Sequence, residues 1–435
     1  MHELTDVRSQ TRLLRDPQIA RCLAGSFLLR GAASGAVALI AFYIADLERA
    51  HAHVRGSLVI GLATLLFFAA EIVGAVVFGA LCDRHGEQRY LRLGPLFGGA
   101  SALVMGLAAA IPVVVVARVF QGLSTAAAVP ATLAILSRHS ADDEDLRGRV
   151  MSAFEISAIG GMAAGFVGVG ALWDRFGLSS FYLMVVVYAA SLALLWGVGR
   201  AHGRHVKVER GAGVRFLRSP RALRLVPAWL AVNAVLGIWL THATHQLKRA
   251  DDPTQLLVGG YTGAEISLYG AVTLGLFVVG IGVWGWAMGR LGSLRVMSLA
   301  LVGLTAMLPG LYFLNWSTPN DAVRIAGWLA VCGAGLVVAS GFTPAALAYL
   351  SKIAEEHATE RGAIMGVYSV LLGVGQAIGA TMGGVAADRW SIDGMIALSA
   401  VFTLGSILAV VALVRADRAF EGGPTAIGAL PSRGA

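Results

Sequence analysis

The sequence of 435 residues is poor in charge and in cysteine. Only 14% of its residues are charged, whereas about a quarter are charged in an average soluble domain, and mean hydropathy is +0.71. This composition excludes an ordinary soluble globular protein. The three cysteines, Cys22, Cys82 and Cys332, fall in or at the ends of apolar stretches. Three residues so placed exclude a disulfide framework and show no metal-ligand spacing, so we expect no metal and no cofactor.

Several catalytic and nucleotide-binding signatures are also missing. No glycine-rich phosphate loop with its lysine occurs, which argues against ATP as an energy source within this chain. No HExxH pair and no cluster of acid, base and nucleophile can be found, so we do not expect an enzyme. The net charge of +8 is spread over short loops, which argues against a nucleic-acid partner. A membrane sensor or a membrane enzyme stays a remote alternative.

Long apolar runs fill the chain instead. A bilayer core of about 30 Å needs about 20 apolar residues per helix, and barrel strands are only about half that length. The runs do not alternate in polarity, so the sequence predicts an all-α membrane protein with twelve transmembrane helices. The expected spans are 19–46, 56–81, 90–110, 111–137, 150–173, 179–199, 222–247, 261–288, 294–315, 322–350, 363–387 and 392–414.

Lysine and arginine residues are distributed unequally between the loops on the two sides of the membrane. Of the 34 Lys and Arg residues, 25 fall on the side of the amino terminus, seven fall on the other side, and Arg30 and Arg118 lie within predicted helices. The excess of cationic loops predicts that both termini are cytoplasmic. Residues 1–18 are polar and the following apolar run is too long for a cleaved signal. We therefore expect an integral protein of the cell (inner) membrane, surrounded by lipids.

The chain repeats itself across its middle. Gly79, Arg84, Gly86 and Arg89 recur 206 residues later, and Gly165, Gly170, Asp174 and Arg175 recur 214 residues later. Both copies start on the same side, so the sequence predicts two parallel, pseudo-symmetric six-helix bundles facing a central cavity. The expected domains are 1–199 and 222–414, joined by a cytoplasmic linker, 200–221, and followed by a cytoplasmic tail, 415–435.

The physical roles of the residues in two motifs can be inferred from their types. In the loop after the second predicted helix, Gly79 favours close helix approach, Gly86 permits a positive φ, and Asp83, Arg84 and Arg89 supply charge at the membrane surface. The predicted fourth helix contains Arg118-Val119-Phe120-Gln121-Gly122, and an arginine at that depth normally faces a cavity or a partner. A topogenic loop and a structural arginine are the simpler interpretations.

These motifs resemble the signature loop and the arginine-x-x-glutamine-glycine motif of the major facilitator superfamily. The resemblance implies that the loop after the second helix is a conformational gate, and that Arg118 takes part in proton coupling. The glycines of the fifth predicted helix, Gly161 to Gly170, partly resemble the motif of drug–proton antiporters. There Phe166 and Val169 replace a proline and a glycine of that motif, and simple helix packing is favoured.

Other polar residues lie inside predicted spans. Arg30 and Glu71 fall at similar depth on the first two helices, either as a structural ion pair or as a pair that protons or substrate switch. The repeat places Asn233 opposite Arg30, so we expect Arg30, Asn233 and Gln376 to contact substrate, and Glu71 and Arg118 to couple protons. His242 and His245, at the outer end of the seventh helix, are interpreted as a solvated interfacial pair. A proton role is the alternative, because histidine titrates near neutral pH.

The preferred function is secondary active transport of a small molecule by alternating access, as a monomer. Proton-coupled export of drug-like or amphipathic compounds comes first, on the resemblance and on the expected apolar cavity. The alternative is proton-coupled or facilitated uptake of an organic anion or metabolite bound at Arg30.

Overall fold

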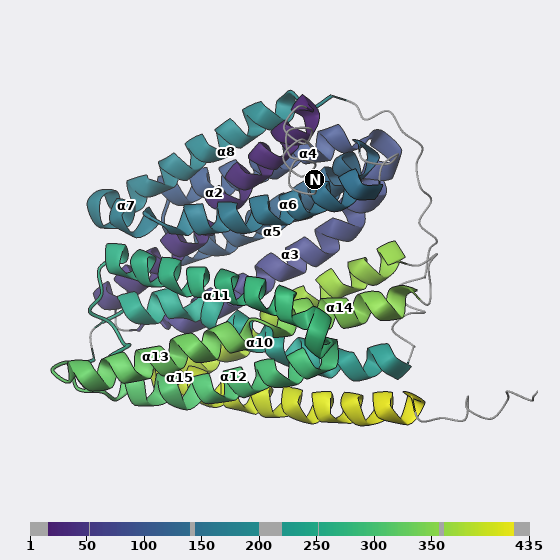
Figure 1. The fold of residues 1–435 in the computed structure, drawn as a ribbon. Coiled ribbons are helices and arrows are strands. Elements are labelled where there is room, and N and C mark those ends of the chain that lie inside the picture. The colour runs from purple at the N-terminus through teal and green to yellow at the C-terminus, as the bar shows by residue number, and fades with distance from the viewer. Residues whose placement is uncertain are drawn as a thin grey trace, which may run out of the picture.

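The structure is a computed structural model and describes residues 16–51, 53–139, 144–199, 220–250, 252–355 and 361–421. Within these ranges every regular element is helical (Figure 1). The helices are α2 (Pro17–Ala50), α3 (Gly56–His85), α4 (Glu87–Leu107), α5 (Ile111–His139), α6 (Glu144–Phe166), α7 (Val169–Phe176), the 3-10 turn η1 (Gly177–Ser179), α8 (Ser180–Trp196), α10 (Pro220–Lys248), α11 (Gly263–Leu291), α12 (Ser293–Asn315), α13 (Ala322–Ala339), α14 (Phe342–Glu355) and α15 (Arg361–Glu421).

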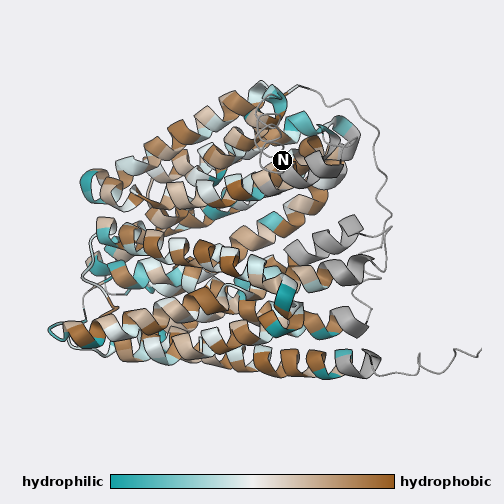
Figure 2. Cartoon of the chain, viewed as in Figure 1, coloured by the Kyte–Doolittle hydropathy of each residue, from teal (hydrophilic) through white to brown (hydrophobic). Residues whose placement is uncertain are grey.

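The twelve predicted spans are confirmed. Ten stretches of the described residues are long and apolar enough to cross a membrane, and two of them, 153–196 and 370–417, are each long enough to cross twice. Apolar residues run along the lengths of the helices, while polar residues gather near their ends (Figure 2). Three details differ from the prediction. The fifth span breaks at Gly168 (φ 81°), the tenth divides between α13 and α14, and α15 continues to Glu421 inside the predicted tail.

The repeat seen in the sequence recurs in the backbone. Gly86 and Gly292, 206 residues apart, separate successive helices with φ of 87° and 78°. Gly177 and Ser391, 214 residues apart, share another unusual conformation, with φ/ψ of 51°/−130° and 50°/−135°. The turn at Ser391 divides α15 into two spans. Equivalent positions therefore make equivalent turns, which is what two copies of one bundle require.

Helix packing repeats as well. A Cβ at Gly165 of α6 would overlap the backbone of Gly31 of α2, and a Cβ at Gly379 of α15 would overlap the backbone of Ala234 of α10. Glycine is required at both crossings because any side chain would force the helices apart. The glycines that partly resemble an antiporter motif therefore pack helices, as the simpler interpretation held.

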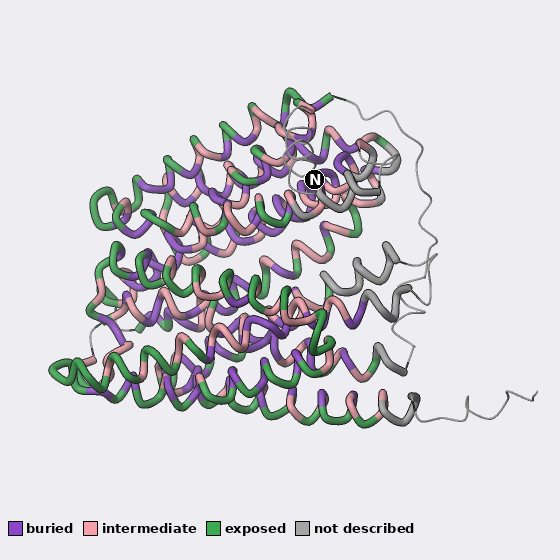
Figure 3. Tube along the Cα trace, viewed as in Figure 1, coloured by how far each residue is buried: buried purple, intermediate pink, exposed green. Residues whose placement is uncertain are grey.

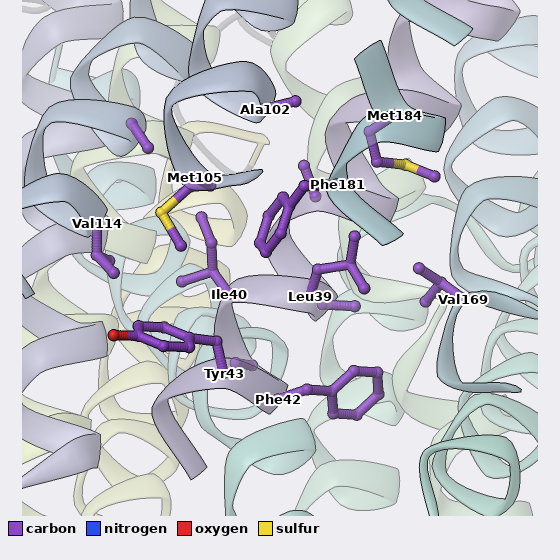
Figure 4. Close-up of a cluster of buried hydrophobic side chains, with 14 of the residues drawn as sticks. Leu39, Ile40, Phe42, Tyr43, Ala102, Met105, Val114, Val169, Phe181 and Met184 are labelled. Atoms are coloured by element: carbon purple, nitrogen blue, oxygen red, sulfur yellow. The ribbon is translucent and has the colours of Figure 1, made fainter. Parts of the chain in front are cut away.

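The helices form two groups, α2 to α8 and α10 to α15 (Figure 1). The first group has its main core where α2 meets α4, α5, α7 and α8, around Leu39, Phe42, Met105 and Phe181 (Figure 4). A separate core in the second group includes Trp229, Met297 and Phe342. Buried residues lie along the helix–helix contacts and exposed ones on the outer faces (Figure 3). The core around Trp229 lies within the second group, whereas the core of the first group also includes Ile266 of α11. The two groups meet along α2, α3, α6, α7, α10, α11 and α15.

Candidate functional site: buried charges between two helix groups

The two groups are joined at one end, here called the closed end, where α2 ends and α3 begins. Glu48 of α2 lies 2.8 Å from His245 Nε2 and 2.8 Å from an Arg249 nitrogen, both at the end of α10. Lys248 donates to Asp174 over 3.0 Å, and Asp174 also accepts from the first backbone N–H groups of α11. These contacts combine charge with caps for helix ends, so they hold the two groups together at this end.

Close backbone approach completes the closed end. A Cβ at Gly170 of α7 would overlap the backbone of Gly263 in α11. Another at Gly61 of α3 would lie 2.6 Å from the carbonyl oxygen of Ala380 in α15. Helices from different groups therefore touch along their backbones here, with little space between them.

The opposite end, which carries Gly86 and Gly292, is different. Among the described residues, no hydrogen bond or ion pair joins the two groups there. A Cβ at Gly79 of α3, or at its repeat partner Gly285 of α11, would meet no atom within 4 Å. The two groups spread apart toward this end, on the right in Figure 1. The polar contacts between the two groups that the described residues make therefore gather at the closed end.

Arg118 lies inside the first group, on α5, and is only 6% exposed. Its guanidinium donates to Gln121 Oε1 over 2.7 Å and to Thr64 Oγ1 of α3 over 3.1 Å, and lies 4.6 Å from the centre of the Phe67 ring. Gly122 is the last residue of the motif, and a Cβ at this position would overlap the backbone of Phe67 in α3. The motif thus brings α5 against α3 and stabilises a buried charge with polar and aromatic partners.

Glu71 of α3 interacts electrostatically with both Arg30 and Arg118. No ion pair within 4.0 Å is formed by Glu71 or Arg30 among the described side chains. Tyr188 of α8 interacts with the same two arginines, and its buried hydroxyl has no hydrogen-bond partner. The structure therefore brings Arg30 and Glu71 into electrostatic interaction, as the sequence suggested, and adds Arg118 and Tyr188 to them.

A small cavity of about 40 Å³ adjoins Arg118 between α2, α3, α5 and α10. Most of its lining is apolar, and the polar groups are Arg118, Thr64 and Thr241. Thr241 is one helical turn from His245, and Ile60, also in the lining, is one turn from Ser57. The cavity therefore separates the buried charges from the polar contacts of the closed end.

The other two predicted substrate-binding residues, Asn233 and Gln376, lie where α10 packs on α15. Asn233 is 2% exposed and donates to the carbonyl of Trp229 on its own helix, against Gly375. Gln376 is half-buried, and its backbone packs on Gly237. Their contact with substrate stays a prediction.

The predicted gate lies at the end opposite the closed end. Gly86 has the expected positive φ, Gly79 faces open space and Arg89 is exposed. Asp83 and Arg84 belong to α3, but their side chains lie outside the described part of the structure. Their role as a gate stays a prediction.

The prediction for the two histidines is wrong. His242 and His245 are both 0% exposed, since α10 is covered by α3 and α15 at this point. His242 Nε2 lies 2.7 Å from the carbonyl oxygen of Ala380, and His245 Nδ1 lies 3.2 Å from Ser57 Oγ. Their place near a helix end suggested solvent, but contacts between the two groups bury them. No three acidic, histidine or cysteine side chains of the described residues are grouped as metal ligands would be.

Comparison with known proteins is consistent with this arrangement. The sequence model of the Major Facilitator Superfamily matches residues 22–259 and 234–433. This chain belongs to that superfamily. Membership confirms the resemblance of its motifs, and makes it an integral membrane protein of a transporter family.

Relatives within the superfamily are distant. The inner membrane transport protein YajR of Escherichia coli is 27% identical over 370 residues, which cover 82% of this chain and 74% of YajR. The MFS-type transporter MJ1560 of Methanocaldococcus jannaschii is 21% identical over 86% of this chain and 94% of its own. Both relatives are named as transporters, which agrees with transport rather than enzymatic activity.

Solved structures share the fold. The nucleoside transporter NupG matches with a TM-score of 0.72 at 12% identity, over 92% of this chain and 98% of that one. A bacterial homologue of the human lysosomal transporter Spinster, in an inward-facing and occupied conformation, matches with a TM-score of 0.70 at 13% identity, over 93% and 97%. At these identities the likeness shows the superfamily fold and says nothing of substrate.

Proposed function

We propose that this chain is a proton-coupled secondary transporter that exports drug-like or amphipathic compounds across the inner membrane. The observation that supports it best is the electrostatic interaction of Glu71 with the half-buried Arg30 and the buried Arg118, in a molecule whose described polar contacts between the two helix groups lie at one end. A carboxylate between two arginines within a membrane span is costly, and such groups commonly bind protons or substrate. Glu71 and Arg118 are the proposed coupling residues.

The orientation belongs to the same proposal. Both termini face the cytoplasm, as the loop charges favour, and the closed end faces outward. Residues 1–199 and 222–414 are the two moving bundles, 200–221 the linker and 415–435 the tail. The protein works as a monomer in lipid, and rocking of the bundles closes the end that carries Gly79, Asp83, Arg84, Gly86 and Arg89.

An apolar binding region favours amphipathic compounds. The cavity beside Arg118 is lined by Val37, Ile40, Ala41, Ile60, Ala63 and Leu240 besides its three polar residues. At about 40 Å³ this cavity is far smaller than a ligand pocket, so its apolar lining would contact the apolar part of a compound only after the bundles move apart. Asn233 and Gln376, now covered or half-covered, would reach substrate only after the bundles move.

The second candidate is uptake of an organic anion or metabolite. Arg30 favours it, because the residue is only half-buried and forms no ion pair within 4.0 Å among the described side chains. An anion could bind there with little competition from protein carboxylates.

Purified protein in liposomes separates the two candidates. The exporter uses a proton gradient directed into the vesicle to expel ethidium, measured by its fluorescence, and Glu71→Gln abolishes the gradient-driven part. Accumulation of small carboxylic acids along the same gradient, with ethidium unmoved, would favour the anion carrier. A thermal-shift screen with Arg30→Ala then locates the ligand, since a shift that survives this change excludes Arg30 from binding.

A further inference from the structure

The small cavity beside Arg118 lies between the two helix groups, and its polar residues come from both of them. Arg118 of α5 and Thr64 of α3 belong to the first group, and Thr241 of α10 belongs to the second. At about 40 Å³ the cavity exceeds the roughly 10–15 Å³ that one water molecule needs. A monatomic ion therefore fits in it, whereas a drug-sized compound does not.

Arg118 has N–H groups that no described protein acceptor uses. A guanidinium carries five N–H groups, and Arg118 donates one to Gln121 Oε1 and one to Thr64 Oγ1. The other three have no hydrogen-bond acceptor among the described residues. Both acceptors are uncharged, and no described carboxylate lies within 4.0 Å of the guanidinium. The positive charge of Arg118 is therefore not paired directly with a described side chain.

The two threonines of the cavity differ from other threonines buried in helices. Thr132 and Thr403 donate to a carbonyl oxygen of their own helix, over 2.8 and 2.7 Å. Thr64 Oγ1 instead accepts from Arg118, so its hydroxyl hydrogen points away from that guanidinium. Neither Thr64 nor Thr241 donates a hydrogen bond to a described residue. Two hydroxyl donors therefore remain at the cavity, beside a cation.

The charged residues near the cavity carry an excess of positive charge. Glu71 interacts electrostatically with both Arg30 and Arg118, so one carboxylate accompanies two guanidiniums. Glu71 is two helical turns from Thr64 along α3, about 10 Å, and does not line the cavity. A charge that is not fully balanced is costly in apolar surroundings, and an anion in the cavity would offset that cost.

We propose that this cavity binds a monatomic anion, of which chloride is the physiological example, between Arg118, Thr64 and Thr241. The free N–H and hydroxyl groups donate to the anion, and the six apolar lining residues exclude water that would weaken the attraction. The bound ion contacts both helix groups, so it favours the conformation in which the closed end is closed. This ion is distinct from the transported compound and from the coupled proton of the proposed function.

Thermal unfolding of the purified protein in detergent, followed by tryptophan fluorescence, tests the site with sodium chloride and sodium bromide as probes. The titration starts in sodium gluconate and keeps the ionic strength constant, because gluconate is too large for the cavity. Each halide should raise the unfolding midpoint in a saturable way, since a ligand that binds only the folded state stabilises it. Thr241→Val removes the hydroxyl and keeps the shape of the side chain, and should raise the halide dissociation constant about tenfold.

Thr403→Val is the matched control, because Thr403 is buried in the second helix group and donates to Ser399 on its own helix. It should respond to halide as the wild type does, and so should Thr241→Ser, which retains the hydroxyl. Equal dissociation constants for the wild type and Thr241→Val would overturn the site. So would a midpoint that the halides raise no further than gluconate does.

Crystals soaked in sodium bromide locate the ion directly, and they decide even if Thr241→Val fails to fold. Anomalous scattering should give a bromide peak within hydrogen-bonding distance of Arg118, between α3, α5 and α10. A peak that is absent there contradicts the proposal, whatever other bromide positions appear. Intact ethidium export in that case would leave the proposed function standing.

Discussion

At the scale of single residues, Arg118 illustrates how a buried charge is retained in a membrane helix. Its guanidinium reaches two acceptors on different helices, Gln121 and Thr64, and lies over Phe67. A lysine has the same charge but lacks the planar fork that serves two acceptors at once. The geometry of this side chain, and not its charge alone, is therefore expected to matter.

Arg118→Lys should accordingly lower ethidium export by about tenfold or more, since hydrogen bonds to charged groups contribute roughly 1.5–3 kcal/mol. Initial rates in liposomes measure this. Arg175→Lys, at an exposed position over Phe176, is the control and should transport normally. Equal rates in both variants would show that charge alone suffices at position 118.

Contacts between single residues could be predicted from the sequence only where the two residues are close together along the chain. Arg118 and Gln121 are one turn apart, so their pairing follows from a local motif. Glu48 and His245 are almost two hundred positions apart, and nothing local shows that the packing of two bundles brings them within 2.8 Å. The repeat predicts a cavity-facing position for Asn233 but not its burial, which follows from how tightly α10 and α15 approach.

At the scale of elements, the turn after the fifth span and the turn inside α15 are equivalent. Gly177 and Ser391 share a positive φ near 50° with ψ near −130°, a conformation that suits glycine and strains serine. The strain at Ser391 is accompanied by a hydrogen bond from Arg249 over 3.4 Å, a long one that offsets little of it.

Ser391→Gly should therefore stabilise the protein by about 1 kcal/mol, and Gly177→Ser should destabilise it by a similar amount. Thermal unfolding in detergent, followed by tryptophan fluorescence, would show a higher midpoint for the first variant and a lower one for the second. Midpoints that move in the same direction would contradict the equivalence of the two turns.

The elements themselves were largely predictable, because span length and the position of charged loops are imposed by the bilayer. Breaks within spans were harder to predict. Gly168 ends α6 with a positive φ, yet the surrounding glycines serve helix packing equally well. Composition alone does not distinguish a glycine that breaks a helix from one that lets another helix approach.

At the scale of the whole molecule, the polar contacts and close glycine crossings that join the two helix groups within the described residues lie at one end. Alternating access requires that these contacts break in each cycle. Arg55 before α3 and Asp388 of α15 lie 3.7 Å apart across the two groups, and the Arg55 side chain is largely exposed. A cross-linker in solution can therefore reach these two positions and join the two helix groups.

The most direct measurement is ethidium export by a protein carrying Arg55→Cys and Asp388→Cys, before and after a short thiol-specific cross-linker joins the two cysteines. Export should proceed before cross-linking, stop once the closed end is tied, and return when a cleavable linker is cut. Each single-cysteine variant treated in the same way should be unaffected. Undiminished export by the fully cross-linked protein would contradict a cycle in which the closed end opens.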